Sequence, residues 1–437
     1  MKPWEKISVS DSGNMVFGGC DCVELAKEYG TPLYVMDERT IRDVCRGFES
    51  ALRRSGAKGR VYYASKALST TALYRIIEQE GLGVDVVSGG ELYTAKNAAF
   101  PAERIVFHGN NKTPDELKMA IEYGVGCIVV DSHEEIGLIA DIAKECEKTV
   151  GVSLRVKPGI EAHTHEFVLT AIDDCKFGLG LYDGEALIAI KQILSRKELV
   201  LIGLHCHIGS QIFELEPFNA AASRLTDFAL TVRNECGAEI EEINFGGGFG
   251  IMYTEDDAEM EPYAFVGDVI SALYANCDEK GLPRYRFAIE PGRSIVGEAG
   301  ITLYTVGTVK HVPGIRTYVS VDGGMGDNPR HILYGAEYVA KLANKPAAPA
   351  TETIAVAGRC CESGDMLIKA AQLPPCEAGD IMAVFSTGAY NYSMASNYNR
   401  VPVPAMVLVN EGKHGLIVKR QSYEQLVEND MMAPWQK

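Results

Sequence analysis

Long apolar runs are missing from the sequence, and none approaches the length of a membrane span. The opening residues, Met1–Glu5, also lack the basic and then apolar pattern of a secretion signal. Positive charge is scarce: 42 lysines and arginines stand against 59 aspartates and glutamates, for a net charge of −17. This balance argues against nucleic acid or an anionic membrane as a partner, although it leaves room for a local basic pocket. We therefore expect a cytoplasmic protein that binds neither.

Cysteines at metal-binding or disulfide spacing are also lacking. The twelve cysteines are scattered, and only Cys20 with Cys22 and Cys360 with Cys361 lie close together. Neither pair has the matching second pair of ligands that a zinc site requires, so we predict reduced thiols and no metal. A chain of 437 residues with 46% hydrophobic and 23% charged residues can bury a large core, and its length suggests two domains.

Apolar runs of strand length alternate with amphipathic helical patterns along the first two thirds of the chain. Eight such runs occupy residues 61–65, 84–88, 105–109, 127–132, 152–156, 201–207, 240–246 and 287–290. Strands that alternate with helices indicate a parallel sheet, and eight consecutive units predict a closed (β/α)8 barrel, the TIM-barrel form of the α/β class. The alternative is an open doubly wound sheet, which is less favoured because no dinucleotide-binding fingerprint opens the first unit.

The pattern changes after Gly292. Short strand-like runs separated by loops, with little helix, occupy residues 301–309, 317–321, 353–356, 381–385 and 401–409. They predict a mainly β domain of sandwich-like or barrel-like form. A strand-like piece also precedes the barrel, so we expect the N-terminus to join this domain. The predicted division is therefore a barrel over residues 34–291 and a β domain over residues 1–33 plus 292–437.

Polar side chains collect where the predicted barrel strands end. Active sites of such barrels lie at the carboxyl ends of the strands, in the loops that lead to the helices. A single polar residue there, such as Lys66, could simply begin a surface helix, but polar groups at nearly every strand end favour a site. The residues concerned are Lys66, Asp85, Glu91, His108, Lys112, Arg155, Lys157, His205, His207 and Ser210.

A glycine run, Gly246–Gly250, follows the seventh strand. Glycines let backbone N–H groups approach an anion closely, and barrels often bind phosphate in the loops after strands seven and eight. The eighth strand ends in Glu290 and Arg293, which adds a guanidinium. The run by itself could be a plain turn. Together with a lysine that can form a Schiff base, however, a phosphate site suggests pyridoxal phosphate, with Glu290 at its ring nitrogen and His207 stacked on its ring.

At this point the chain resembles the fold-type III pyridoxal-phosphate decarboxylases. The resemblance extends from Thr31–Asp37 to Tyr390–Tyr398 and includes the lysine motif Tyr63-Ala-Ser-Lys66-Ala and the motif His207-Ile-Gly-Ser210-Gln. It implies that Lys66 carries pyridoxal 5′-phosphate, that His207 stacks on the ring and that Glu290 meets the pyridine nitrogen. The remaining expected cofactor contacts are Asp85, Ser210, Gly247, Gly248, Gly292, Arg293 and Tyr390.

Two segments of the β domain resemble the substrate-binding parts of the same family, Asp322–Tyr334 and Gly358–Asp365. The resemblance implies that Arg293, Arg330 and Tyr334 bind substrate carboxylates, which suits the two parallel N–H groups of a guanidinium. It further implies that Cys361 is the catalytic acid, that Glu362 binds the distal ammonium and that Tyr390 contacts cofactor and substrate. In the family the Cys361–Glu362 segment comes from the other subunit, which predicts a homodimer with shared active sites.

The resemblance implies one reaction, decarboxylation of meso-2,6-diaminopimelate to L-lysine and CO₂, the last step of lysine biosynthesis. Alternatives are a decarboxylase of ornithine, arginine or carboxynorspermidine, an amino-acid racemase on the same fold, and a non-catalytic regulator that binds pyridoxal phosphate. Ornithine and arginine lack the distal carboxylate that Arg330 is expected to bind. Four positions depart from the family pattern without removing an assigned group: Leu68, Lys157, Asn244 and Asn391.

Overall fold

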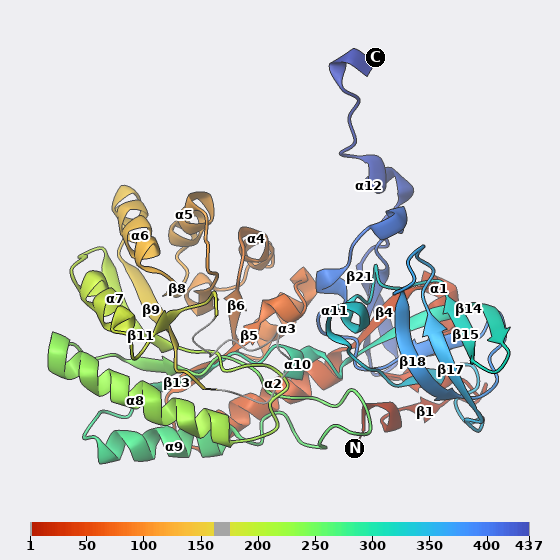
Figure 1. Ribbon diagram of the computed structural model, residues 1–437, viewed down its shortest axis with the longest axis horizontal. Helices are drawn as coiled ribbons and strands as arrows, with labels where there is room; N and C mark the ends of the chain where they lie inside the picture. Colours follow the sequence, from red (N-terminus) through yellow and green to blue (C-terminus); the bar gives the residue numbers. More distant parts are fainter. Residues whose placement is uncertain (1, 161–174, 437) are drawn as a thin grey trace. The chain divides into compact units, whose positions relative to one another are not determined.

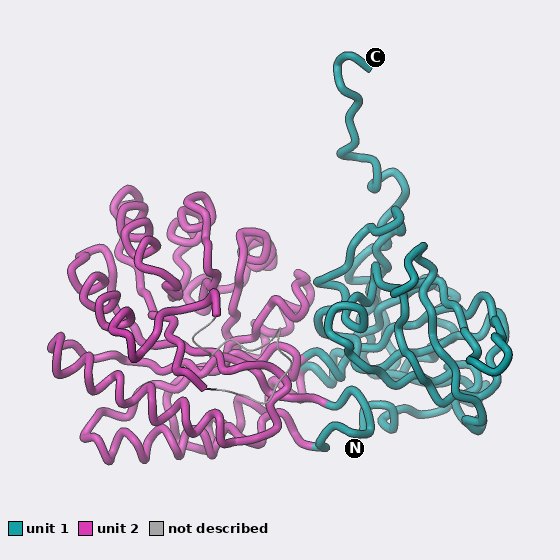
Figure 2. Tube along the Cα trace, in the orientation of Figure 1, with its two compact units in different colours: residues 1–41, 252–259, 296–437 teal, residues 42–251, 260–295 magenta. Residues whose placement is uncertain are grey.

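The computed structural model of the protein describes residues 2–160 and 175–436. Figure 1 shows its helices and strands, and Figure 2 shows that the chain divides into two compact units. The larger unit, which we call the barrel unit, comprises residues 42–251 and 260–295. The other, the β unit, comprises residues 1–41, 252–259 and 296–437. In the described part of the chain, no helix has both the length and the apolar content needed to cross a membrane.

The barrel unit is built on a closed ring of parallel strands, which confirms the predicted TIM barrel. The ring runs β5-β6-β7-β8-β9-β11-β12-β13 and closes where β13 pairs with β5, and each of these pairings is parallel. One short strand of two residues, β10, pairs with β9 outside the ring. The strands are β5 Gly59–Ala64, β6 Gly83–Val86, β7 Ile105–Phe107, β8 Cys127–Val130, β9 Val150–Lys157, β10 Leu179–Gly180, β11 Leu199–His205, β12 Glu242–Asn244 and β13 Arg286–Ile289.

Helices connect successive strands and lie outside the ring (Figure 1). Polar caps start several of them: the side chains of Thr70, Ser88 and Ser132 each accept a backbone N–H of the first turn, and Thr113 forms a capping box with Glu116. Each cap fixes the start of a helix a few residues after a strand ends. The helices are α2 Glu38–Arg54, α3 Thr71–Gln79, α4 Gly89–Asn97, α5 Pro114–Tyr123, α6 His133–Glu145, α7 Glu185–Leu194, α8 Glu216–Cys236, α9 Val266–Glu279 and the short α10 Arg293–Val296.

The β unit is organised around one long strand, β14 (Gly300–Val312). It pairs antiparallel with β15 (Arg316–Val321), β19 (Ile381–Val384) and β4 (Leu33–Asp37). The N-terminus therefore contributes a strand to this sheet, and the residue-34 division predicted from the sequence falls within β4. The other elements are β1 Ser8–Val9, β2 Met15–Phe17, β3 Cys20–Asp21, α1 Cys22–Tyr29, α11 Arg330–Tyr334, β16 Ala340–Leu342, β17 Glu352–Ala357, β18 Met366–Leu373, β20 Ala405–Asn410, β21 Lys413–Val418 and α12 Tyr423–Val427.

The core of the β unit joins its N-terminal and C-terminal segments. Alternate residues of β4 and β14 are fully buried together with side chains from β19 and β20, as the period-two pattern of a strand requires. Burying a large aliphatic side chain stabilises a fold by about 1.5–3 kcal/mol, so this cluster ties the two ends of the chain together. Its members include Leu33, Val35, Ile301, Leu303, Ala383, Phe385, Val407 and Val409.

Candidate active site

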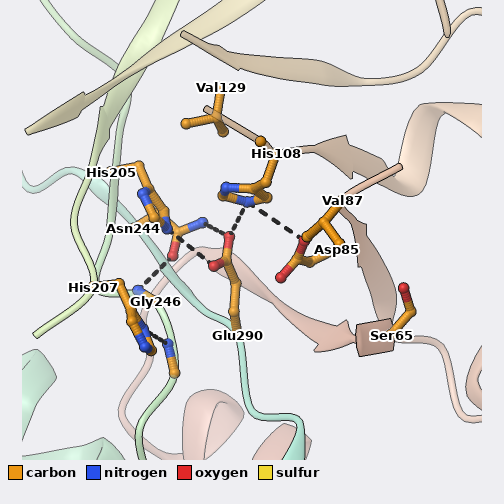
Figure 3. A network of polar contacts seen from close by, with 12 residues as sticks. Ser65, Asp85, Val87, His108, Val129, His205, His207, Asn244, Gly246 and Glu290 are labelled. Atoms are coloured by element: carbon orange, nitrogen blue, oxygen red, sulfur yellow. Dashed lines mark hydrogen bonds and ion pairs between the residues drawn. The ribbon is translucent and has the colours of Figure 1, made fainter. Parts of the chain in front are cut away.

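A single buried carboxylate, Glu290, lies at the centre of a polar network at the mouth of the barrel (Figure 3). It directly follows β13. Its oxygens accept hydrogen bonds from His108 Nε2 at 2.8 Å, from His205 Nε2 at 3.0 Å and from Asn244 Nδ2 at 2.7 Å. These partners lie at or just after the ends of β7, β11 and β12, so barrel closure brings together residues that are far apart in the sequence.

The hydrogen bonds determine the charge of Glu290. Burial by itself raises the pKa of a carboxyl group, but contacts with His108 and His205 hold the pKa of Glu290 well below its usual range. Burial lowers the pKa of His205 to about 4, so this ring is neutral near pH 7 and donates its Nε2 hydrogen. Asn244 stands where the family pattern has an aspartate, and its amide supplies a third donor in place of a second negative charge. Glu290 is therefore an ionised carboxylate that accepts hydrogen bonds from three donors.

The same atoms could in principle hold a metal ion. His108, His205 and Glu290 each offer one ligand atom, and these atoms lie within 4.8 Å of one another in the described structure. Both imidazole Nε2 atoms, however, point at carboxylate oxygens at hydrogen-bond distance, so they carry hydrogens rather than lone pairs available to a metal. The geometry therefore fits a carboxylate held in place by donors better than it fits a metal centre.

Lys66 and Asp85 lie near this network. Lys66 belongs to the single turn Ser65–Ala67 directly after β5, and its side chain is exposed. Asp85 is buried near the end of β6, and its Oδ1 lies 3.9 Å from His108 Nε2 without a hydrogen-bond partner among the described residues. Burial raises the pKa of Asp85 to about 6, while the charges of His108 and Lys66 oppose the shift. The ammonium of Lys66 is thus close enough to Asp85 to influence its ionisation.

His207 is a neutral ring beside the glycine run. Burial and the positive charges of Lys66 and Arg155 hold the pKa of His207 well below its usual range. Its Nδ1 accepts the backbone N–H of Gly247 at 3.2 Å, which places the ring hydrogen on Nε2. Asn244 Oδ1 likewise accepts the N–H of Gly246 at 2.9 Å, so the Glu290 network and the glycine run are connected.

The glycines after β12 lie where no side chain fits. A Cβ on Gly247 would lie 2.3 Å from the carbonyl oxygen of Glu290. A Cβ on Gly248 would lie 2.6 Å from the carbonyl of Gly209, and its φ of +109° also favours glycine. The loops after β11, β12 and β13 are therefore packed backbone against backbone, so the chain can pass close to a ligand at these glycines.

Arg293 lies beside the loop that follows β11. Its Nη2 donates to Ser210 Oγ at 3.0 Å, so the loop after β13 meets the loop after β11. The preceding residue, Gly292, could not carry a Cβ without lying 2.9 Å from that of Ala64, at the end of β5. The structure thus gathers in one region the residues that the sequence assigned to a phosphate. A hydroxyl, a guanidinium and glycine N–H groups together form a donor set for an anion.

Two sequence segments of the β unit meet at Asp365. Its carboxylate accepts the N–H of Met325 at 2.6 Å and the N–H of Cys360 at 2.7 Å. The backbone N–H of Cys361 donates to Asn399 Oδ1 at 2.7 Å, and Glu362 follows, with Cys361 and Glu362 both exposed. Asp365 and Asn399 were not among the predicted site residues. Both residues hold the Cys361 loop through hydrogen bonds. Only Asp365 had a signal in the sequence, because it ends the segment Gly358–Asp365.

Arg330 is buried in the β unit against aromatic rings. Its guanidinium carbon lies 4.8 Å from the centroid of the Tyr253 ring, and Nη1 donates to the hydroxyl of Tyr338 at 3.1 Å. Among the described residues no carboxylate forms an ion pair with it. Tyr334 and Tyr390 are half-buried, and Tyr390 has a φ of +61°, which is a strained conformation for a tyrosine. Sequence reasoning missed Tyr253 and Tyr338, because isolated aromatic residues carry no motif.

Asp327, three positions before Arg330 in the sequence, makes the stability of the protein depend on pH. Burial raises the pKa of Asp327 to about 7, although Tyr304 donates to its Oδ2 at 2.5 Å. The native state then keeps a proton that the unfolded chain has lost between about pH 4 and 7. Unfolding free energy should fall as pH rises through this window, by up to about 1.4 kcal/mol per pH unit from this group.

Replacing Asp327 with asparagine should flatten that slope, and urea midpoints measured between pH 4 and 8 would show it. Asp11→Asn, a change at an exposed carboxylate, serves as the control and should leave the slope unchanged. Equal slopes for D327N and the unchanged protein would contradict the prediction.

Comparisons with known proteins agree with this geometry. Residues 38–297 match a family model described as the pyridoxal-binding domain of pyridoxal-dependent decarboxylases. Diaminopimelate decarboxylase of Bacillus subtilis (strain 168) is 50% identical over 419 residues, covering 96% of this chain and 95% of that protein. The Staphylococcus aureus (strain COL) diaminopimelate decarboxylase is 45% identical over 425 residues, covering 97% and 99%. A crystal structure of the M. jannaschii diaminopimelate decarboxylase with L-lysine has a TM-score of 0.93 and 36% identity, covering 100% of both chains.

Proposed function

The chain belongs to the pyridoxal-dependent decarboxylase family, and we propose that it converts meso-2,6-diaminopimelate to L-lysine and carbon dioxide. The observation that carries the proposal is likeness along the whole chain to diaminopimelate decarboxylases, one of them 50% identical over 96% of it. The likeness includes the β unit, whose segments around Arg330 and Cys361 were predicted to bind the substrate.

The donor set of the barrel unit fits pyridoxal 5′-phosphate, which presents a phosphate, a ring nitrogen and an aldehyde. Ser210 and Arg293 suit the phosphate, together with the backbone at Gly247 and Gly248, where an added Cβ would lie against a neighbouring carbonyl. Lys66 offers an exposed amine to hold the aldehyde carbon covalently. When bound, the cofactor supplies an electron sink for the electrons left behind on the substrate α-carbon.

With the cofactor bound, Glu290 would hold a proton on its ring nitrogen. An ionised carboxylate stabilises a positively charged partner, and His108, His205 and Asn244 prevent Glu290 from turning away or taking up the proton itself. His207 is neutral, so it can lie against the ring without adding a competing charge. Asp85, whose ionisation responds to Lys66, is placed to bind the lysine ammonium or a polar group of the cofactor.

Residues of the β unit are proposed to recognise the substrate. Arg330 is a buried cation without a carboxylate partner among the described residues, an arrangement that costs free energy unless an anion binds. A substrate carboxylate supplies that anion, with Tyr334 and Arg293 as further carboxylate contacts. Glu362 is proposed to bind the distal ammonium, and Tyr390 to contact cofactor and substrate.

We propose that the enzyme is a homodimer in which each subunit lends Cys361 and Glu362 to its partner. Both side chains are exposed on their own chain, which suits groups that act elsewhere. Cys361 would return a proton to the α-carbon after carbon dioxide leaves. Mixing inactive K66A with inactive C361A should restore roughly a quarter of the activity, because half of the dimers then contain one complete site. Failure of any mixture to recover activity would contradict shared sites.

The twelve cysteines support a further part of the proposal, that the enzyme acts in the cytoplasm. All of them are free thiols in the structure, and Cys20, Cys22 and Cys45 are buried. Free thiols persist in reducing compartments and are oxidised elsewhere.

The decisive experiment is an assay of the purified protein with meso-2,6-diaminopimelate, ornithine, arginine and carboxynorspermidine. Lysine and carbon dioxide should form from the first compound in equal amounts. Formation of products from another amino acid alone would sink the proposal, and interconversion of stereoisomers without carbon dioxide would identify a racemase. R330M should raise KM for diaminopimelate, because the buried carboxylate-binding cation is lost while the side-chain volume is nearly kept.

Gly247 offers a test of the phosphate site. We expect Gly247→Ala to destabilise the protein by about 1–3 kcal/mol, because the new Cβ meets the Glu290 carbonyl, and to weaken binding of pyridoxal phosphate. Gly267→Ala is the matched control: it lies in α9 with no atom within 4 Å of the added Cβ. Urea unfolding and equilibrium dialysis of the cofactor measure the two effects. Normal cofactor retention in G247A would contradict the assignment of this loop.

A further inference from the structure

The chain after β21 forms an exposed arm, defined here as residues 422–436. In Figure 1 it is the blue segment that runs away from the strands of its own unit through α12. All fifteen residues are described, and none of them is buried. Its large apolar side chains are open to solvent: Tyr423 is 74% exposed, Val427 55%, Met431 93%, Met432 70% and Trp435 85%. A run of exposed large apolar residues is unusual unless something covers it.

Polar contacts hold the arm in place. Just before it, Arg420 Nη2 donates to three backbone carbonyls near the end of α1, those of Tyr29, Gly30 and Pro32. Within it, Asp430 pairs with Arg400 Nη2 at 2.8 Å, and a capping box starts α12. The arm therefore has a specified position and internal structure. Ordering a segment costs conformational entropy, and no arm residue is fully buried against its own chain to offset that cost.

The arm is continuous with the surface around Cys361. Arg400, which holds the arm, directly follows Asn399, whose Oδ1 accepts the N–H of Cys361. Exposed apolar side chains also border the Cys361 loop: Ile332 is 39% exposed, Leu333 48% and Tyr398 40%. Gly364 packs against Ile332, since a Cβ on that glycine would lie 2.9 Å from Ile332 Cδ1. Apolar side chains of the arm and of the Cys361 surroundings thus belong to one hydrogen-bonded region of the β unit.

We propose that the arm docks on a second copy of this chain and extends the dimer interface beyond the Cys361 loop. The inference rests on the proposed function for the location of that interface, because Cys361 and Glu362 act on the partner only if the partner covers this region. We infer a second copy as the partner because the arm is continuous with the Cys361 region, which the second copy is proposed to cover. In a two-fold dimer each copy covers the arm of the other, so the same side chains contribute twice.

Photo-crosslinking tests the proposal without any substrate. A benzophenone amino acid is placed at Trp435, at Met431 and, as a control, at Ile315, which is 72% exposed on the turn between β14 and β15. Full-length light-isotope and heavy-isotope chains are mixed at a concentration that permits exchange and then irradiated. Cross-linked peptides that join light to heavy chains are expected from Trp435 and Met431 and not from Ile315. Cross-links confined to one chain, or none from the arm, would overturn the proposal.

Dimer affinity provides the second measurement. Ending the chain after Gln421, or replacing Trp435 with serine, should raise the dimer dissociation constant by about tenfold or more in sedimentation experiments. Trp435→Phe should retain most of the affinity. An unchanged dissociation constant in both the shortened chain and W435S would overturn the arm's role even if lysine formation is normal. Conversely, a full-length protein that cross-links through the arm but forms no lysine would contradict the proposed function and leave the arm assignment standing.

Discussion

Replacing Lys66 with alanine is expected to lower kcat for diaminopimelate decarboxylation on the order of 10³-fold or more. The side chain supplies an amine at the carboxyl end of β5. Its positive charge opposes the rise that burial causes in the pKa of Asp85 and adds to the fall that burial causes in the pKa of His207. Alanine removes the amine that, by our proposal, would hold the cofactor aldehyde. Residual turnover would depend on the proposed phosphate-binding residues, Ser210 and Arg293, and on Glu290.

Two variants make the Lys66 result specific. Lys66→Arg keeps the positive charge but not the nucleophilic amine, so it should be nearly as inactive as K66A. Lys96→Ala removes a lysine from α4, outside the ring of strands, and should leave kcat unchanged. Borohydride reduction followed by peptide mass analysis should place pyridoxal phosphate on Lys66 in the unchanged protein and in K96A. Cofactor bound to a different lysine would disprove the assignment.

Glu290→Gln should lower kcat by about 10²- to 10³-fold while the fold is retained. Glutamine keeps the shape but loses the charge that holds a proton on the ring nitrogen. Its amide nitrogen would also face a donor, since His108 Nε2, His205 Nε2 and Asn244 Nδ2 all donate to the carboxylate. Steady-state kinetics should show the loss mainly in kcat, because Glu290 acts on the electron sink and not on substrate recognition.

Glu242→Gln is the matched control for this prediction. Glu242 begins β12, at the opposite end of the barrel strands, and burial raises its pKa to about 7. Near pH 7 it is already partly protonated, so the amide changes little and activity should stay close to normal. If E242Q loses as much activity as E290Q, general damage to the barrel would explain both, and the special role of Glu290 would have to be abandoned.

Much of the barrel unit could be predicted because its information is local. Apolar runs of four to seven residues that alternate with amphipathic helices specify β/α units without reference to distant residues. The observed strands β5 and β13 begin within two residues of the predicted runs. The β unit was harder: β16, β18 and β21 were not predicted, because an edge or partly exposed strand has no continuous apolar run. Its strand order depends on pairing between chain ends that local patterns do not report.

The site divides in the same way. That Lys66, Asp85, His207 and Glu290 would lie at one mouth followed from their positions at strand ends, since closure of a parallel barrel brings all such ends together. Which groups would surround Glu290 did not follow. His108 and Glu290 are 182 positions apart, and their hydrogen bond depends on backbone register and rotamers set by the packed ring. Asn244, noted in the sequence only as a departure from a pattern, becomes a donor because the structure aims it at the carboxylate.

The sequence by itself therefore determined the barrel and the family, and it led to the proposals for Lys66 and the glycine run, since each depends on residues that are neighbours along the chain. The tertiary structure decided the charge state of Glu290, the burial of Arg330 away from any carboxylate of the described residues, the link between two segments at Asp365 and the exposure of the arm. Those properties depend on burial and on distances between remote residues. Both quantities arise only when the chain is folded, because desolvation and hydrogen bonding act through space rather than along the sequence.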